Sequence, residues 1–386
     1  MNFDESISRN ETNCVKYDER ISKFGVNDIL PLWVADMDFA TSPAIIEAMK
    51  NRIEHPVFGY SFYATAYFDA IQNWYWTKHD LRISNEQIVP VNNIASAVAV
   101  AIEIFSDTGD GVLIQTPLYP PFREAIIRHE RVVVESKLVL KDGKYEIDWE
   151  DFKLKAREAK IFLFCSPHNP TGRVWRREEI ELMSEICKEN GVLIVSDEIH
   201  SDLTHDKYKH IQIASLNNKN IITLNSPAKR FNIPSIINAY AIIKDDNLRE
   251  QFINGVAKYS PHTPSPLMQY ITIAAYEDSS KWISDVDKYL ANNLKYILDE
   301  IKKTPQIKAI MPEASFLLWL DCRGLNMNSD NLAHLFIHKL KLGLNNGIDF
   351  GNNGDGFMRL NYAVPRSILV EAVDRLKFIS KGASCH

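Results

Sequence analysis

Short apolar runs alternate with segments of helical spacing through the middle of the chain, from about residue 85 to 245. Several helical segments lie between these runs, such as 178–190, which Gly191 is expected to end. Unbroken apolar strands alternating with helices are typical of a mostly parallel sheet covered on both faces, so the pattern predicts an α/β fold. The runs predict buried strands at 112–114, 161–164, 192–195, 221–224 and 239–243.

The pattern changes on either side of this region. The first residues, to about Ala40, mix charges with an apolar segment at 29–34 and predict an ordered arm, after which 41–43 begins a helix. Beyond about residue 265, one long helix is expected at 266–303. A strand at 316–320, a glycine-rich turn at 347–356 and a last strand containing Arg359 should follow. We therefore expect an N-terminal arm at 1–40 that joins the small domain, a large domain at 41–285 and a smaller α+β domain at 286–386.

Polar motifs follow the predicted strands at the points where the strands end. In parallel sheets, ligands bind beyond the carboxyl ends of the strands. An amide (Asn169), a carboxylate (Asp197) and an amine (Lys229) from neighbouring strand ends are what an enzyme needs to hold pyridoxal phosphate. The lysine would form a Schiff base, the acid would pair with the ring nitrogen, and the amide would bond the ring oxygen. The motifs are 116–119, 166–172, 197–200 and 226–229.

Each of these residues also has an ordinary structural interpretation. Asp197 could cap a helix or form a structural salt bridge, and Lys229 could be a solvated surface lysine. Asn169 could merely stabilise its proline-rich turn. Tyr119 could pack in the core instead of presenting its ring face to a planar heterocycle.

Two further positions could bind charged groups. Residues 91–97 open an apolar helix whose N-terminus could bind phosphate, unless Asn93 simply caps it. Arg359 is a charge within an otherwise apolar strand. It suits either a substrate carboxylate or a structural ion pair.

Composition excludes several classes of function. A net charge of −6 with a pI near 6.0 argues against nucleic-acid binding. The five cysteines, one of them Cys385, form no CxxC pair, so neither a disulfide framework nor a zinc site is indicated. The N-terminus is unlike a secretory signal, and no apolar run is long enough to span a bilayer. We expect a cytoplasmic protein without metal.

Several of these motifs resemble those of the fold-type-I pyridoxal phosphate enzymes, the aminotransferase class I/II superfamily. More narrowly, the chain is similar to the cystathionine β-lyase (C–S lyase) branch of MalY/PatB type, over nearly its whole length. The string 32–39 and His200, where general aminotransferases usually carry Tyr, are specific to that branch. The motifs are 32–39, 58–60, 116–119, 169–172, 197–200, 226–229 and 359–361.

The resemblance implies a fold-type-I large domain and assigns roles around the cofactor ring. Lys229 is implied as the Schiff-base lysine and the base that transfers the proton. Asp197 pairs with the pyridine nitrogen, Asn169 bonds the ring hydroxyl, and Tyr119 stacks on the ring as a further catalytic residue. His200 also belongs to the cofactor-binding set.

Further roles are implied at the phosphate and at the substrate. Ser226 and the amides of Ile94 and Ala95 hold the phosphate of pyridoxal 5'-phosphate. Tyr60 reaches the phosphate of the neighbouring subunit, which implies a homodimer with composite active sites. Arg359 takes the α-carboxylate of an amino-acid substrate.

The chain also departs from the family pattern. Asn93 stands where glycine is common, Arg230 replaces the usual Thr after the lysine, and 234–235 is Pro-Ser instead of Ala-Gly. Many aminotransferases have a phosphate-binding arginine where this chain has Ile237. That last difference fits the lyase branch.

The function expected is β-elimination of L-cystathionine, L-cysteine or related S-conjugates to a thiol, pyruvate and ammonia. An aminotransferase shares every step up to the carbanion and is the closest alternative. A regulatory protein that keeps the fold and binds partners is a further alternative. A nicotinamide-dependent oxidoreductase is disfavoured, because no GxGxxG follows an early strand.

Overall fold

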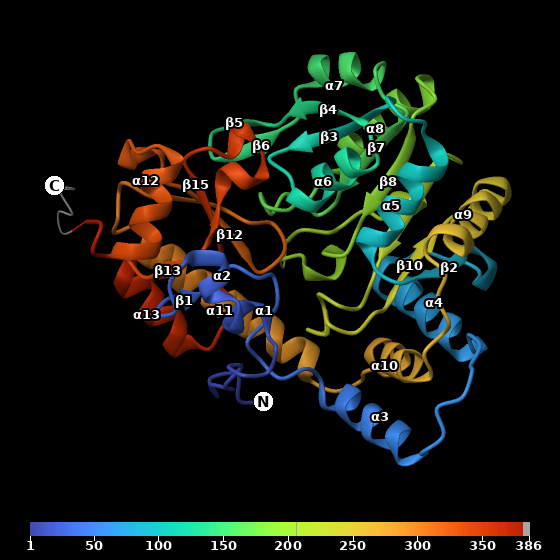
Figure 1. Cartoon of the computed structure of the whole chain (residues 1–386), viewed down its shortest axis with the longest axis horizontal. Coiled ribbons are helices and arrows are strands. Elements are labelled where there is room, and N and C mark those ends of the chain that lie inside the picture. Colours follow the sequence, from blue (N-terminus) through green and yellow to red (C-terminus); the bar gives the residue numbers. More distant parts are fainter. Residues whose placement is uncertain (206, 381–386) are drawn as a thin grey trace.

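The computed structural model describes residues 1–205 and 207–380 and contains two large β-sheets in different halves of the molecule (Figure 1). Cys385 and the end of the predicted small domain, 381–386, lie outside the described residues. Among the described helices, none has both the length and the apolar character needed to cross a bilayer.

The larger sheet has seven strands in the order β2-β10-β9-β8-β7-β3-β4. The five strands from β9 to β4 run parallel, whereas β10 is antiparallel to both β9 and β2. Every residue of β3, β7, β8 and β9 is buried, which explains the apolar runs that these strands contain. The strands are β2 Ile88–Val91, β3 Gly111–Thr116, β4 Val132–Lys137, β7 Ile161–Cys165, β8 Leu193–Asp197, β9 Ile221–Asn225 and β10 Ala239–Ile242.

Helices cover both faces of this sheet and form a separate apolar core on each. On one face α5 packs against α6 and α9, and on the other lie α7 and α8. Alternate strand residues point to opposite cores: Leu163 packs with the first group and Phe162 with the second. The predicted α/β fold is therefore confirmed. The helices are α5 Ile94–Phe105, α6 Pro120–Arg128, α7 Trp149–Ala156, α8 Arg177–Glu189 and α9 Asp246–Tyr259.

The single helix predicted at 266–303 is wrong, because the chain breaks at 277–281 into α10 and α11. The carboxylate of Asp278 accepts hydrogen bonds from the hydroxyl of Ser42 (2.5 Å) and the backbone N–H of Ser280 (2.7 Å). The hydroxyl of Ser280 accepts from the N–H of Trp282 (3.1 Å), which starts the next helix. α10 (Pro266–Tyr276) then packs on α3 (Pro43–Glu54) and α4 (Thr65–His79), while α11 (Trp282–Ile301) leads to the smaller sheet.

The smaller sheet is antiparallel, in the order β11-β12-β15-β14, and carries Arg359 in β15. The N-terminal arm lies beside this half of the molecule (Figure 1), and its strand β1 pairs in parallel with β13. The expected domain boundaries near 40 and 285 stay a prediction. The elements are β1 Leu30–Pro31, β11 Lys308–Ile310, β12 Leu317–Asp321, β13 Leu342–Gly343, β14 Asn345–Asn346, β15 Phe357–Asn361, α12 Ser329–His334 and α13 Arg366–Leu376. The arm also holds α1 (Val15–Asp18) and α2 (Arg20–Phe24), and β5 (Val139–Lys141) forms a hairpin with β6 (Lys144–Glu146).

One glycine joins the turn after β7 to the smaller sheet. Gly172 has a φ of +70°, and a Cβ at this position would lie 2.8 Å from the Cβ of Pro312. Its carbonyl accepts hydrogen bonds from the N–H groups of Glu313 (2.8 Å) and Ala314 (3.0 Å). The turn that carries Asn169 therefore rests directly on the segment that leads into β12.

We predict that Gly172→Ala destabilises the protein by about 2–4 kcal/mol, from left-handed backbone strain plus the steric clash. Gly143→Ala is the matched control, because Gly143 also has a positive φ (+77°) but nothing lies within 4 Å of its added Cβ. That variant should lose only the stability that backbone strain costs, about 1–2 kcal/mol. Thermal unfolding of both cofactor-free variants checks this, and equal losses would contradict it.

Candidate active site

The polar motifs predicted at the strand ends meet in one cavity of about 410 Å³. β7, β8 and β9 are parallel neighbours, so the residues that follow them emerge at the same edge of the sheet. Eight of the ten predicted site residues line this cavity. They are Ile94, Ala95, Tyr119, Asn169, Asp197, His200, Ser226 and Lys229.

Lys229 extends its amine into this cavity. The amine donates a hydrogen bond to the carbonyl of Ala35 (2.6 Å), within the string 32–39. Burial lowers the pKa of Lys229 to about 8; Arg359 also lowers it, and Asp36 and Asp197 oppose the shift. The surface-lysine interpretation is excluded, and about a tenth of this amine is neutral at pH 7.

Asp197, the last residue of β8, is a buried carboxylate. Burial raises its pKa to about 6, while the N–H of Ile199 (3.0 Å) and the charge of Lys229 act in the opposite direction. Within the described residues Asp197 forms no salt bridge, so that interpretation is excluded. Its carboxylate is available to pair with a protonated ring nitrogen.

His200 is only 4% exposed, and its Nδ1 has no hydrogen-bond partner in the described structure. Burial lowers its pKa to about 3, and the positive charges of Lys229 and Arg359 add to the effect. The imidazole is therefore neutral. A buried, unpartnered polar atom at the cavity wall indicates that a bound group completes its hydrogen bonding.

Arg359 is a buried guanidinium that has no acidic partner within the described part of the chain. Its Nη1 donates to the Oδ1 of Asn169 (2.9 Å), and its Nη2 donates to the Oδ1 of Asn345 (2.8 Å) and the carbonyl of Trp33 (3.0 Å). Its Nε is buried without a partner. Burial lowers the pKa of Arg359 to about 10. The structural ion pair is thus excluded, and the site suits a carboxylate.

The N-terminus of α5 supplies a place for a phosphate. Asn93 caps the helix, since its Oδ1 accepts the N–H of Ser96 (2.8 Å). The amides of Ile94 and Ala95 come before that capped position and border the cavity, where first-turn N–H groups lack partners inside the helix. The two interpretations of this segment are therefore compatible: Asn93 caps the helix and leaves two amides for an anion.

Arg359 and Tyr60 are the two predicted site residues that do not line this cavity, and Ser226 lines it with its hydroxyl already engaged. The hydroxyl of Ser226 lines the cavity but donates to the carbonyl of Asn238 and accepts from the N–H of Ala228 (3.1 Å). Its proton is therefore already used within the protein. Tyr60 is fully exposed and is not brought to this cavity by its own chain, whereas Tyr119 borders the cavity with 40% of its surface exposed.

No chemical feature of the sequence predicted that the backbone of the string 32–39 belongs to the site. Asn361 donates to the carbonyls of Val34 (2.7 Å) and Asp36 (2.5 Å), and Asn232 donates to the carbonyl of Met37 (2.9 Å). These amides hold the string across the cavity, where Ala35 meets Lys229. The only signal was the family resemblance of the string, because a carbonyl contact has no side-chain signature.

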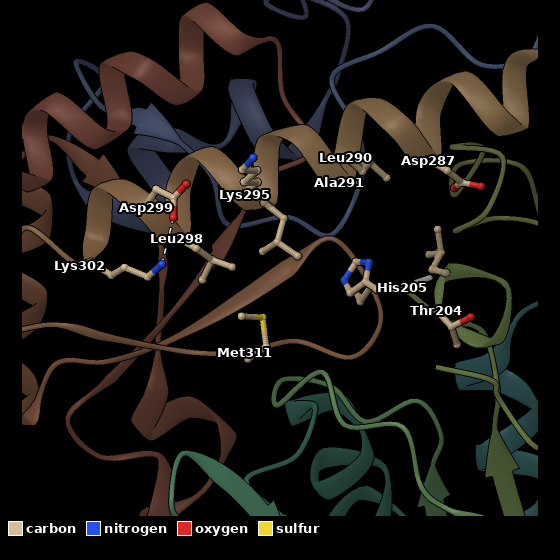
Figure 2. A pocket seen from close by; sticks show the side chains of 13 residues that line it. Thr204, His205, Asp287, Leu290, Ala291, Lys295, Leu298, Asp299, Lys302 and Met311 are labelled. Atoms are coloured by element: carbon tan, nitrogen blue, oxygen red, sulfur yellow. Dashed lines mark hydrogen bonds and ion pairs between the residues drawn. The ribbon is translucent and has the colours of Figure 1, made fainter. Parts of the chain in front are cut away.

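A second cavity, of about 370 Å³, lies between α11, Thr204–His205 and Met311 (Figure 2). None of the predicted site residues lines it. Its Lys302 and Asp299 already pair with each other at 3.0 Å. The strand-end cavity is therefore the candidate active site.

The residues of the strand-end cavity fit pyridoxal 5'-phosphate. They offer a partly neutral amine, a carboxylate for the ring nitrogen, a neutral imidazole with an unpartnered Nδ1, and two helix-terminal amides for the phosphate. Arg359 lies beside this set through its hydrogen bond to Asn169.

Comparison with known proteins agrees with this assignment. The family model for aminotransferase class I and II matches residues 27–376. The chain is 35% identical to cystathionine beta-lyase PatB of Bacillus subtilis, over 98% of this chain and 99% of PatB. It is 36% identical to protein MalY of Escherichia coli, over 97% of each chain. The solved structure of the pyridoxal phosphate-bound C–S lyase of Staphylococcus hominis matches with a TM-score of 0.91 and 31% identity, over 98% of each chain.

We predict that Asp197→Asn stabilises the cofactor-free protein at pH 8 but not at pH 4. The folded carboxyl holds its proton up to about pH 6, whereas the unfolded one loses it near 3.8, so wild-type stability falls between these values. The difference between the folded and unfolded pKa of Asp197 corresponds to a change of about 3 kcal/mol at most in the free energy of unfolding. Melting temperatures of both proteins across this range check the sign. A variant less stable than wild type at pH 8 would contradict it.

Proposed function

The chain belongs to the aminotransferase class I and II family, and from this premise we propose that it is a pyridoxal phosphate-dependent carbon–sulfur β-lyase. Its substrates are L-cystathionine, L-cysteine or related S-conjugates, and its products are a thiol, pyruvate and ammonia. The observation that carries the proposal is the cavity that Lys229 and Asp197 line together, with Arg359, which has no acidic partner among the described residues, beside it. Likeness to PatB and to the Staphylococcus C–S lyase over almost the whole chain favours this reaction within the family.

Arg359 binds and orients the substrate. Its guanidinium is buried, lacks a carboxylate partner in the described chain and keeps an unpartnered Nε, so a substrate α-carboxylate supplies the missing charge. Asn169 and Asn345 hold the planar group in place through its two Nη atoms. The carboxylate thereby fixes the α-carbon near the end of the Lys229 side chain.

Lys229 moves the α-proton. With a pKa of about 8, its amine is neutral often enough near neutral pH to accept a proton and still returns it readily. When bound, pyridoxal phosphate supplies an electron-accepting ring that stabilises negative charge at the substrate α-carbon. Asp197 keeps the ring nitrogen protonated, and Tyr119 covers one side of the cavity. The C–S bond then breaks with the electron pair leaving on the thiolate, and water hydrolyses the released aminoacrylate to pyruvate and ammonia.

The active enzyme is proposed to be a homodimer with composite sites. A surface segment near the end of α3 exposes large apolar and aromatic side chains that a single chain leaves in solvent. Tyr60, in this segment, is assigned to the phosphate of the neighbouring subunit. The exposed side chains are Val57 (63%), Phe58 (58%), Tyr60 (101%) and Phe62 (79%).

We propose a cytoplasmic location for the enzyme. Cys14, Cys165, Cys187 and Cys322 are all free thiols in the structure. Unpaired cysteines are typical of proteins in reducing compartments.

Purified protein with pyridoxal phosphate should release pyruvate and a free thiol from L-cystathionine without any keto-acid acceptor. Coupled pyruvate detection and a thiol reagent measure the two products, and Lys229→Ala is the inactive control, with an expected loss of at least about 10³-fold. Turnover that requires a keto acid would assign the protein as an aminotransferase instead. Bound cofactor with no turnover of any amino acid would favour the regulatory alternative.

The composite site predicts complementation between two inactive variants. Lys229→Ala and Tyr60→Ala each impair every site of their own homodimers, but a mixed dimer contains one site with both native residues. Co-refolding them should restore up to about a quarter of wild-type activity, as random pairing makes half of the dimers mixed. No recovery, with mixed dimers confirmed by differential tagging, would exclude Tyr60 from the partner's site.

A further inference from the structure

Arg230 follows Lys229 but does not line the cofactor cavity. Its side chain is buried and forms a two-point ion pair with Asp287 of α11, with Nη1–Oδ1 at 2.5 Å and Nη2–Oδ2 at 2.8 Å. A two-point arginine–carboxylate pair fixes orientation as well as distance, which a threonine at this position cannot do. Figure 2 shows Asp287 on α11, at the Thr204 side of the second cavity.

The residue after Arg230 is attached to the same helix. Phe231 is completely buried and stacks on Trp282, the first residue of α11, with ring centroids 6.1 Å apart and planes 16° apart. Both residues that follow Lys229 thus dock on the first two turns of α11. A shift of the segment that contains Lys229 would therefore displace α11 as well, or break these contacts.

Further along, α11 is tied to the strand that carries Arg359. The fully buried Asn293 donates from Nδ2 to the carbonyls of Tyr362 (3.1 Å) and Val364 (2.8 Å), directly after the end of β15. Asp287 and Asn293 are six residues apart, which is about 9 Å along a helix. One rigid element therefore contacts the surroundings of both Lys229 and Arg359.

We propose that Arg230 and Asp287 are positioning residues that set the separation between the Lys229 amine and the Arg359 guanidinium through α11. This proposal rests on the proposed function only for the roles of Lys229 in moving the α-proton and of Arg359 in binding the carboxylate. Proton removal requires the amine to point at the α-carbon that the carboxylate has positioned. A displacement of about 1 Å can cost up to about 100-fold in rate.

The test removes Asp287, which is half-exposed and outside the active-site cavity. Exchange of the α-proton of L-alanine in D₂O, followed by NMR, reports proton movement by Lys229 without a leaving group, so it works for a lyase or an aminotransferase. Asp287→Asn should lower the maximal exchange rate by about 10- to 100-fold. The half-saturating alanine concentration and the cofactor dissociation constant should each change less than threefold. An exchange rate within twofold of wild type would overturn the proposal.

Two further variants separate positioning from a general loss of structure. Asp246→Asn removes the carboxylate partner of another arginine, Arg249 (2.7 Å), on α9 and should leave exchange unchanged. Arg230→Lys keeps the charge but not the two-point geometry, so it should resemble Asp287→Asn. If it instead keeps the wild-type rate, the two-point pair is not what positions Lys229.

A measurement on the cofactor-free protein tests the physical link without catalysis. Hydrogen–deuterium exchange by mass spectrometry should be faster in Asp287→Asn than in wild type for peptides covering 226–237 and 357–364, and unchanged for α9. Acceleration confined to α11 itself would overturn the proposal. A wild-type protein that moves no α-proton would sink the proposed function, yet this measurement would still decide whether the link exists.

Discussion

The active site depends on removing four ionisable side chains from water in one place. Arg359, His200 and Asp197 are buried and Lys229 is half-buried at or beside the cavity, and loss of contact with water is the largest cause of the pKa shift of each. The same desolvation has different chemical results. It makes the lysine a usable base, keeps the imidazole neutral, and leaves the arginine in need of an anion. Burial of charged groups without charge partners is destabilising, and under the proposed function the substrate and the cofactor supply the missing partners.

A second group of charged residues holds the string 32–39 next to this site. Asp36 and Asp38 both pair with Arg9, at 2.6 Å each, and the completely buried Lys16 lies 3.0 Å from Asp38. Arg9 and Lys16, which precede the string in the N-terminal arm, thus hold its two acidic residues in place. Asp36 also favours the charged form of Lys229, so the arm moderates the depression of that pKa. The arm is thus part of the electrostatics of the site and not only a packing element.

The sequence was informative where local pattern and chemistry coincide. Asp197 ends one strand that begins with an apolar run and Lys229 follows the next, and parallel strand order brings such residues to the same edge of the sheet. It was uninformative where a contact joins distant segments through the backbone, as between Lys229 and the carbonyl of Ala35, 194 positions away. It was misleading at 266–303, where helical spacing continues across the turn that Asp278 stabilises through Ser42. The engaged hydroxyl of Ser226 likewise could not be seen from residue type.

Lys229 lies in the turn that follows β9 of the larger sheet, and Arg359 lies in β15 of the smaller one, so the geometry of the proposed reaction depends on how the two sheets are joined. Three of the connections that do this are the string 32–39, the hydrogen bonds from the N–H groups of Glu313 and Ala314 to the carbonyl of Gly172, and α11. Each binds backbone or buried polar groups on both sides, so none can slide without leaving such groups unpaired, at about 1–3 kcal/mol each. Substitutions at these connections should therefore alter proton transfer while every cavity-lining residue stays native. A search for specificity limited to the cavity wall would miss them.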